Sequence, residues 1–178
     1  MGAAGAIRPP FGLSAWQMPL MTAEIVPYRA SHRIAWSALN LGWLEEGGFT
    51  VEPKDRRTIE DPEGSILAEG GRIFIVEQDG EAVGCCALLR MEDGGFELAK
   101  MAVAPAARGQ GLGRRLLEAC EAEARSAGAP RLYLESSSTL APALALYRSF
   151  GFIDLPPQPS PYARADVWME KRLQPRDP

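Results

Sequence analysis

The sequence predicts a mixed α/β (α+β) fold: a twisted, mostly antiparallel central sheet with one parallel strand pair, flanked by about four helices. Two observations carry this prediction. Asp79-Gly80 separates two apolar runs, residues 72–77 and 81–89, and this dipeptide is a strong signal for an antiparallel hairpin. Later in the chain, an apolar run, a glycine turn, a long amphipathic segment and a second apolar run indicate a strand–helix–strand crossover. Such crossovers are right-handed and join parallel strands.

Length and composition indicate one globular domain. The chain has 178 residues, of which 46% are hydrophobic and 24% charged, and this length is enough to bury a sizeable core. We expect residues 21–178 to form a single domain without internal repeats. Residues 1–20, rich in Gly, Ala and Pro, are expected to be a loose leader, with Met21 as an alternative start.

Charge, apolar runs and cysteines exclude several classes of protein. The formal net charge is −4, which disfavours a nucleic-acid-binding surface. The longest apolar run, near residues 83–89, is far shorter than the ~20 residues of a membrane-spanning helix. Cys85, Cys86 and Cys120 lie in apolar stretches. They are expected to be reduced core residues of a cytoplasmic protein and not a disulfide framework.

The first predicted elements are a short strand and two helices. Residues 25–28 form the strand, Ser31 is placed to cap a helix over residues 32–45, and a shorter helix covers residues 53–59. Acidic residues gather around the two helices: Glu45, Glu46, Glu52, Asp55, Glu60, Asp61 and Glu63. Such a run usually marks a solvated face, and the alternative is a surface that attracts a cationic amine.

The centre of the chain combines a strand, a glycine turn and a long helix. Residues 96–103 read as a strand that ends before Pro105. Gly128 stops the helix. The helix is predicted from apolar residues at every fourth position: Leu112, Leu116, Cys120 and Ala124.

The last predicted elements complete the sheet. Residues 131–135 form a strand parallel to the central one, residues 142–150 a short helix, and residues 166–173 a final strand after a proline-rich loop. Ligands of such sheets bind beyond the carboxyl ends of the parallel strands. Residues 108–113 lie at that position.

The turn at residues 108–113, Arg-Gly-Gln-Gly-Leu-Gly, has the features of an anion site. A helix N-terminus presents backbone N–H groups without internal partners, and alternate glycines let a phosphate approach the backbone. The P-loop pattern fails because Gly113 is followed by Arg114 and Arg115, and the glycine spacing does not match the dinucleotide fingerprint. The alternative is a tight turn whose glycines serve geometry alone.

Two segments of the chain resemble the GNAT superfamily of acetyl-CoA-dependent N-acetyltransferases. The first is the pattern Arg/Gln-x-x-Gly-x-Gly/Ala, met by Arg108, Gly111 and Gly113 after the central strand. The second is Ala-x-x-x-Tyr-x-x-x-Gly-Phe, met within residues 143–152. Both motifs occur in order and at a suitable separation, and the resemblance covers roughly residues 22–173.

The resemblance implies acetyl-CoA as cosubstrate, no metal, and direct transfer to a primary amine in a ternary complex. It implies that backbone groups of residues 101–103 pair with the pantetheine arm and that a nearby N–H polarises the thioester carbonyl. It also implies that the glycine turn grips the pyrophosphate. The expected cofactor-binding residues are Met101, Ala102, Val103, Arg108, Gly109, Gln110, Gly111, Leu112, Gly113 and Arg114.

The resemblance also assigns the proton transfers. Glu97 matches a position that family members often use as general base, sometimes through a water, and Tyr147 matches a tyrosine that protonates or hydrogen-bonds the CoA sulfur. The structural alternatives are a strand-edge acid and a core aromatic. Glu135, Tyr162 and Arg164 are further candidates for contacting the acceptor.

One position departs from the family pattern. Many members carry Asn, which helps to hold the pantetheine arm, about where Leu140 stands, and Ser138 or Thr139 are candidates to replace it. The sequence shows no metal-ligand cluster. The expected partner is a small-molecule or peptide amine, with no nucleic acid or membrane, and homodimerisation is left open. The alternative functions are a CoA-binding regulatory module without turnover and a transferase for a longer acyl group.

Overall fold

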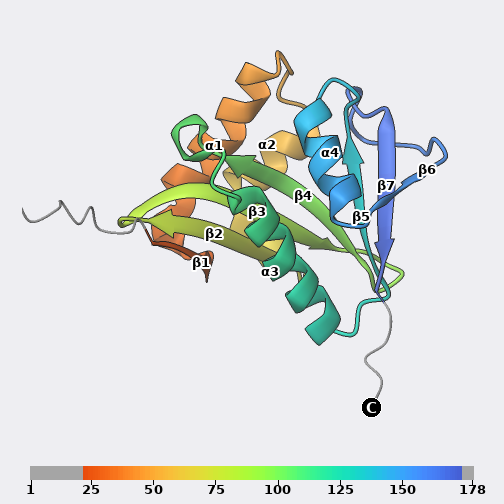
Figure 1. The fold of residues 1–178 in the computed structure, drawn as a ribbon, viewed down its shortest axis with the longest axis horizontal. Helices are drawn as coiled ribbons and strands as arrows, with labels where there is room; N and C mark the ends of the chain where they lie inside the picture. Colours follow the sequence, from red (N-terminus) through yellow and green to blue (C-terminus); the bar gives the residue numbers. More distant parts are fainter. Residues whose placement is uncertain (1–21, 174–178) are drawn as a thin grey trace, which may run out of the picture.

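The computed structural model describes residues 22–173, which form one seven-stranded mixed sheet flanked by helices (Figure 1). The strand order is β1-β2-β3-β4-β5-β7-β6, and among these strands only β4 and β5 pair in parallel. The predicted fold class is therefore confirmed. The predictions for residues 1–20 and for Met21 lie outside the described residues.

The boundaries follow the expected pattern closely. The strands are β1 (Ala23–Pro27), β2 (Arg72–Gln78), β3 (Glu81–Arg90), β4 (Phe96–Val103), β5 (Arg131–Ser136), β6 (Ile153–Leu155) and β7 (Val167–Arg172). The helices are α1 (Arg33–Glu46), α2 (Pro53–Glu60), α3 (Leu112–Ser126) and α4 (Ala141–Ser149), with short helical turns η1 (Ala30–His32), η2 (Glu63–Leu67) and η3 (Pro105–Ala107).

Two details differ from the sequence predictions. The predicted cap Ser31 lies inside η1, where the His32 ring accepts the Arg29 backbone N–H at 3.0 Å instead. Strand β6 was not predicted, because its three residues are too few to show the alternation of apolar and polar side chains that marks a strand. The hairpin turn is as expected: Asp79 and Gly80 both have positive φ, 52° and 83°, as a type I′ turn requires.

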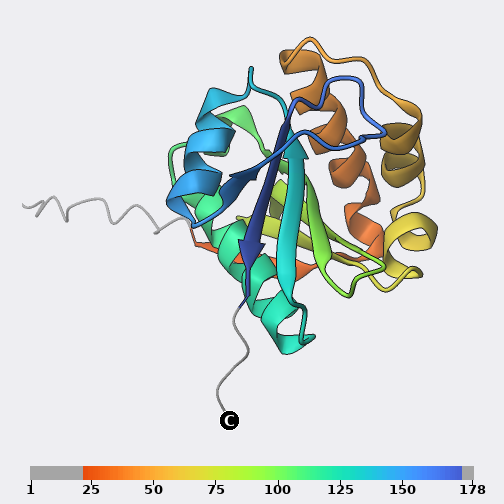
Figure 2. The ribbon, with the colours of Figure 1, turned by 90° about the vertical axis from the view of Figure 1, so that its right-hand side faces the viewer.

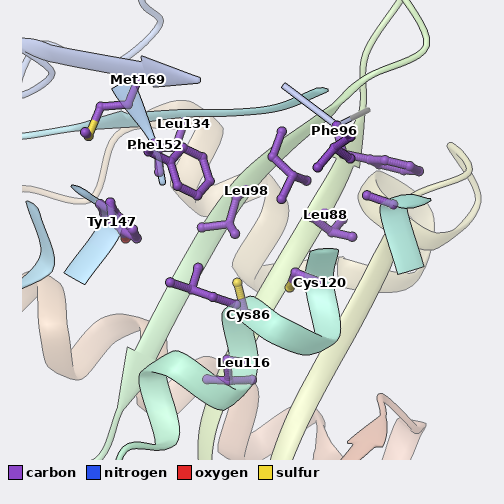
Figure 3. Packing of buried hydrophobic residues seen from close by; sticks show 14 of the residues in the cluster. Cys86, Leu88, Phe96, Leu98, Leu116, Cys120, Leu134, Tyr147, Phe152 and Met169 are labelled. Atoms are coloured by element: carbon purple, nitrogen blue, oxygen red, sulfur yellow. The ribbon is translucent and has the colours of Figure 1, made fainter. Parts of the chain in front are cut away.

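Helices cover both faces of the sheet, so the protein has three layers (Figure 2). On one face, α3 buries its apolar stripe, including Leu116 and Cys120, against Cys86, Leu88 and Phe96 (Figure 3). The other face carries a second apolar cluster beneath α1 and η2, built from Tyr28, Trp36, Ile66, Ile73, Ile75, Cys85, Ala87 and Ala102. Within residues 22–173, no helix has both the length and the apolar character needed to cross a bilayer.

Candidate active site

The site is a cleft of about 630 Å³ at the point where β4 and β5 separate. These parallel strands pair only at Phe96 with Leu132 and at Glu97 with Tyr133, and beyond this point they diverge (Figure 1). The cleft is lined by β4, the ends of β5 and α1, the start of α4 and the loop before β7. The divergence exposes the edge of β4, so a ligand can contact strand backbone there.

The glycine turn has the backbone that an anion site needs. Gly109 and Gly111 have φ of 78° and 74°, and a Cβ at either position would meet open space. Gly111 is also the N-cap of α3, so the free N–H groups of the first helical turn follow directly. Gly113 has a different role, because a Cβ there would lie 3.1 Å from Leu146 Cδ2. It permits close packing of α3 on α4.

The polar side chains around the turn are held by other parts of the protein. The Arg108 guanidinium donates to both carboxylate oxygens of Glu46, at 2.7 and 2.6 Å. Gln110 accepts from Gln78 at 3.0 Å, and Arg114 lies 5.5 Å from the Phe150 ring centroid. The turn therefore offers mainly backbone N–H groups to an anion.

A β-bulge interrupts β4 at the middle of the cleft. Cys85 pairs with Ala102 and Ala87 with Ala99, so Lys100 and Met101 together oppose one residue of β3. Lys100 has φ of 55°, a strained conformation for a non-glycine residue. Bulges leave ladder groups unpaired, and residues 97–103 all line the cleft.

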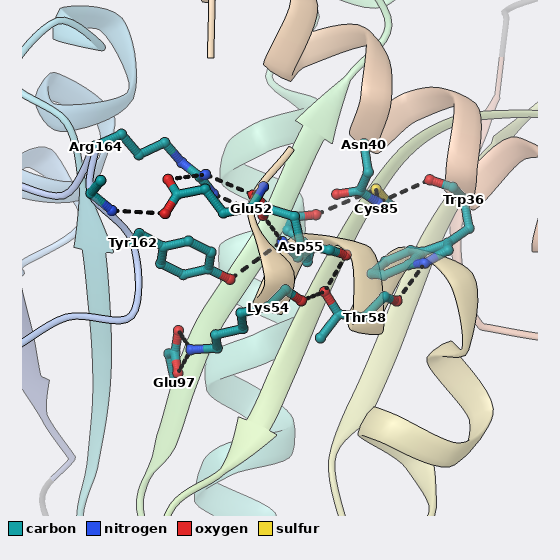
Figure 4. Close-up of polar contacts among 12 residues, drawn as sticks. Trp36, Asn40, Glu52, Lys54, Asp55, Thr58, Cys85, Glu97, Tyr162 and Arg164 are labelled. Atoms are coloured by element: carbon teal, nitrogen blue, oxygen red, sulfur yellow. Dashed lines mark hydrogen bonds and ion pairs between the residues drawn. The ribbon is translucent and has the colours of Figure 1, made fainter. Parts of the chain in front are cut away.

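A buried ionic cluster joins β4, α2 and the loop before β7 (Figure 4). The Asp55 carboxylate accepts from Lys100 Nζ and, at 2.7 and 2.8 Å, from Arg164. Burial alone would raise the pKa of Asp55, but the hydrogen bonds from Arg164 and Lys100 outweigh it and the pKa is lowered. Burial lowers the pKa of Lys100, and the contact with Asp55 opposes that shift.

This cluster was not predicted. Asp55 belongs to the acidic run that was read as a solvated face, yet its side chain is fully buried. The expectation for that run is wrong at this residue, because cations from two distant segments offset the cost of burying the carboxylate. Lys100, inside the apolar run of β4, was the one sequence signal of a buried partner.

Glu97 lies in the cleft, as the resemblance implies, but it already has a cationic partner. Lys54 Nζ of α2 lies 2.9 Å from each of its carboxylate oxygens. An ionised carboxylate has about four lone-pair positions, and Lys54 occupies two. About two lone-pair positions of Glu97 therefore remain to accept a proton or a hydrogen bond from water.

Tyr147 also lines the cleft and packs against Phe152, on the same side of the sheet as Cys86 and Cys120 (Figure 3). Burial, and then the two thiols, raise the pKa of Tyr147. Among residues 22–173, no hydrogen bond involves its hydroxyl group. The hydroxyl is therefore protonated and available to a ligand in the cleft.

The three acceptor candidates all line the cleft. Arg164 is engaged by Asp55 and Glu52 and stacks on Tyr162, with 4.2 Å from its guanidinium carbon to the ring centroid. Glu135 accepts from the Ser160 hydroxyl at 2.5 Å and from the Tyr133 hydroxyl at 3.2 Å.

The residues around Leu140, where many family members carry Asn, lie at the α4 side of the cleft. Thr139 and Leu140 line it, whereas Ser138 donates to Asp166, with 2.6 Å between Ser138 Oγ and Asp166 Oδ2. Of the two candidates to replace the Asn, Thr139 lines the cleft and Ser138 does not. Within the described residues 22–173, no group of His, Cys, Asp and Glu side chains is arranged to hold a metal ion.

Comparisons with known proteins agree with this geometry. The sequence profile of the acetyltransferase (GNAT) family matches residues 32–152. An IAA acetyltransferase of Azospirillum brasilense is 43% identical over 105 residues, which cover 57% of this chain and 68% of the relative.

Solved structures show the same fold. A GNAT-family acetyltransferase from Staphylococcus aureus has a TM-score of 0.78 at 20% identity, covering 86% of this chain and 100% of that one. N-acetylglutamate synthase from Neisseria gonorrhoeae, solved with coenzyme A and N-acetyl-glutamate, has a TM-score of 0.66 at 25% identity. That match covers 86% of this chain and 35% of that one.

Proposed function

This chain belongs to the acetyltransferase (GNAT) family, and we propose that it transfers the acetyl group of acetyl-CoA to a primary amine by direct attack within a ternary complex. One observation carries the proposal. A single cleft runs from Arg108, the first residue of the glycine turn, along the bulged edge of β4 to Glu97 and Tyr147. The groups for holding a donor and for moving protons thus share one space.

The residues present suit acetyl-CoA. Gly109 and Gly111 leave open space over the N-terminus of α3, where a pyrophosphate is favoured by free N–H groups and the helix dipole. The bulge at Lys100 and Met101 offers strand backbone to the pantetheine arm and an N–H to the thioester carbonyl. When bound, acetyl-CoA supplies the activated acyl group.

We assign the proton transfers to two residues, one on β4 and one on α4. Glu97 accepts a proton from the amine, directly or through a water, with the lone pairs that Lys54 leaves free. Tyr147 donates its proton to the departing sulfur, and its raised pKa keeps that proton in place at neutral pH. The new bond is the amide C–N bond, and the thioester C–S bond breaks.

Two finer features belong to the same proposal. Tyr162 and Arg164 form the acceptor end of the cleft together with Glu135. The three free, buried cysteines support a location in the reducing cytoplasm.

The rival function is a CoA-binding regulatory module without turnover, and the Lys54 ion pair on Glu97 favours it because the expected base is already engaged. A CoA-release assay over a panel of amines, run beside calorimetric titration with acetyl-CoA, separates the two. Transfer predicts binding and release with at least one amine. Binding without release on every amine supports the module. The same assay with butanoyl-CoA tests the alternative of a longer acyl group.

A further inference from the structure

The cleft as a whole has an uneven charge balance. Among residues 22–173, four cations lie in or beside the cleft: Lys54, Lys100, Arg108 and Arg164. Five carboxylates accompany them: Glu46, Glu52, Asp55, Glu97 and Glu135. The net charge of these side chains is therefore −1, and the ion pairs show which carboxylate has no cationic partner.

Each of the four cations already has a carboxylate of this chain. Lys54 is bound by Glu97 at 2.9 Å and Arg108 by Glu46 at 2.6 Å. Lys100 and Arg164 share Asp55, and Arg164 also reaches Glu52 at 3.1 Å. A carboxylate on a ligand would therefore have to displace one of these partners. For the mostly buried Lys54, Lys100 and Arg164, losing that partner is strongly unfavourable. The Arg108–Glu46 pair is about half exposed and lies at the glycine turn.

Glu135 is the carboxylate without a cation. Its contacts among residues 22–173 are two hydroxyl groups, Ser160 at 2.5 Å and Tyr133 at 3.2 Å, with no Lys, Arg or His within ion-pair distance. The residue stands on β5, two positions beyond Tyr133, which is the register partner of Glu97. Side chains two apart share a face. Glu97 and Glu135 thus flank the opening between the two strands on one side of the sheet.

We propose that the acceptor is a primary amine that carries a second, cationic group and no carboxylate, and that Glu135 binds this second group. The proposal rests on the acetyl transfer proposed above and names the substrate class. With the reacting amine near Glu97 and neutral at the moment of attack, the second cation balances the remaining negative charge. A hydrogen bond between charged groups is stronger than one between neutral groups, and within residues 22–173 each of the four cations is already held by a carboxylate of this chain.

Three related amines test the proposal on the wild-type protein: cadaverine, lysine and pentylamine. Lysine is cadaverine with a carboxylate added, and pentylamine is cadaverine with one amine removed. Steady-state CoA release should give cadaverine a kcat/KM at least about tenfold above both others, since an unpaired charge in such a site costs at least that much. Equal or better turnover of lysine or pentylamine overturns the substrate class and leaves acetyl transfer standing. Release with none of the three and with no other amine contradicts acetyl transfer itself, and the inference falls with it.

Variants at Glu135 locate the binding group. Glu135→Gln should raise KM for cadaverine roughly tenfold or more, leave kcat nearly unchanged and remove the preference over pentylamine. Glu135→Asp, which keeps a carboxylate, should retain part of the preference for cadaverine over pentylamine. Glu60→Gln, an exposed carboxylate on α2, is the matched control and should behave as wild type. An unchanged KM in folded Glu135→Gln overturns the assignment. If that variant does not fold, the comparison of the three amines on the wild type still decides the substrate class.

Discussion

Lys54 Nζ lies 2.9 Å from both carboxylate oxygens of Glu97, so the expected general base is held by an ammonium of the same chain. The two side chains come from α2 and β4 and are mostly buried, at 24% and 14% exposure. A symmetric contact of this kind fixes the orientation of the carboxylate. Glu97 can therefore act only through the lone pairs that point away from Lys54.

Glu97→Gln should lower turnover by about 100-fold or more while leaving acetyl-CoA affinity nearly unchanged. The amide keeps the size of the side chain and an oxygen for Lys54, and it loses the ability to take a proton. The loss should be greatest at low pH, where the amine is mostly protonated and most needs a base. Rates measured from pH 6 to 9 check this. A variant profile that follows the wild type would remove Glu97 from the mechanism.

Lys54→Met should lower kcat by up to about 100-fold, because without the Lys54 ammonium the Glu97 carboxylate is no longer held in position to accept a proton. The affinity for acetyl-CoA should not change, since Lys54 lies on α2, away from the glycine turn. Lys54→Arg should recover most of the activity by holding the carboxylate through two N–H groups. If Lys54→Met keeps the wild-type kcat, Lys54 does not position Glu97.

Asp55→Asn should reduce the free energy of unfolding by about 3–5 kcal/mol at pH 7, because Lys100 and Arg164 lose their shared buried partner. The pKa of Asp55 is lowered in the folded protein. Its contribution is therefore present above the unfolded-state pKa of about 3.9 and is lost as the pH falls through the lower, folded-state value.

Urea unfolding at pH 7 and at pH 3 measures both effects. The difference between wild type and Asp55→Asn should be smaller at pH 3, and Glu60→Gln should show no comparable change at either pH. An equal difference at the two pH values would show that the ionised carboxylate is not the stabilising group.

Gly111→Ala should weaken acetyl-CoA binding far more than Gly128→Ala. Both glycines have left-handed φ, 74° and 69°, and a Cβ at either would meet open space. The two substitutions therefore carry a similar strain of about 1–2 kcal/mol, but only Gly111 lies beside the N–H groups of the α3 N-terminus. Calorimetry with acetyl-CoA and thermal melts compare them. Equal affinities at matched stability would refute the phosphate site.

Local patterns in the sequence predicted most of the fold. The four-residue period starting at Leu112 placed α3, and Asp79-Gly80 placed the β2–β3 hairpin. The ionic contacts of the site could not be predicted from the sequence, because they join residues far apart in the chain. Lys54 and Glu97 are 43 residues apart, and Asp55 and Arg164 are 109 apart.

The positions of individual site residues were partly predictable. The family resemblance singled out Glu97 and Tyr147 for proton transfer, and both line the cleft. It did not reveal that Gly113 packs against Leu146 or that Glu135, among the five carboxylates of the cleft in residues 22–173, lacks a cation, since both depend on which side chains meet across elements.

Tyr147 links the geometry of the cleft to the chemistry of transfer. Its hydroxyl forms no hydrogen bond within the described residues, and burial raises its pKa, so the hydroxyl keeps its proton and is free to donate a hydrogen bond to a departing thiolate. Tyr147→Phe keeps the ring, its packing on Phe152 and α4, and removes only the hydroxyl.

The most direct test is the acetyl-CoA affinity and turnover number of purified Tyr147→Phe beside the wild type, with the best amine of the panel. We predict an unchanged melting temperature, an affinity within a factor of about two, and turnover lowered by roughly 100-fold or more, as expected for loss of a general acid. Turnover equal to the wild type would show that Tyr147 is a core aromatic and that the cleft does not transfer acetyl groups in this way.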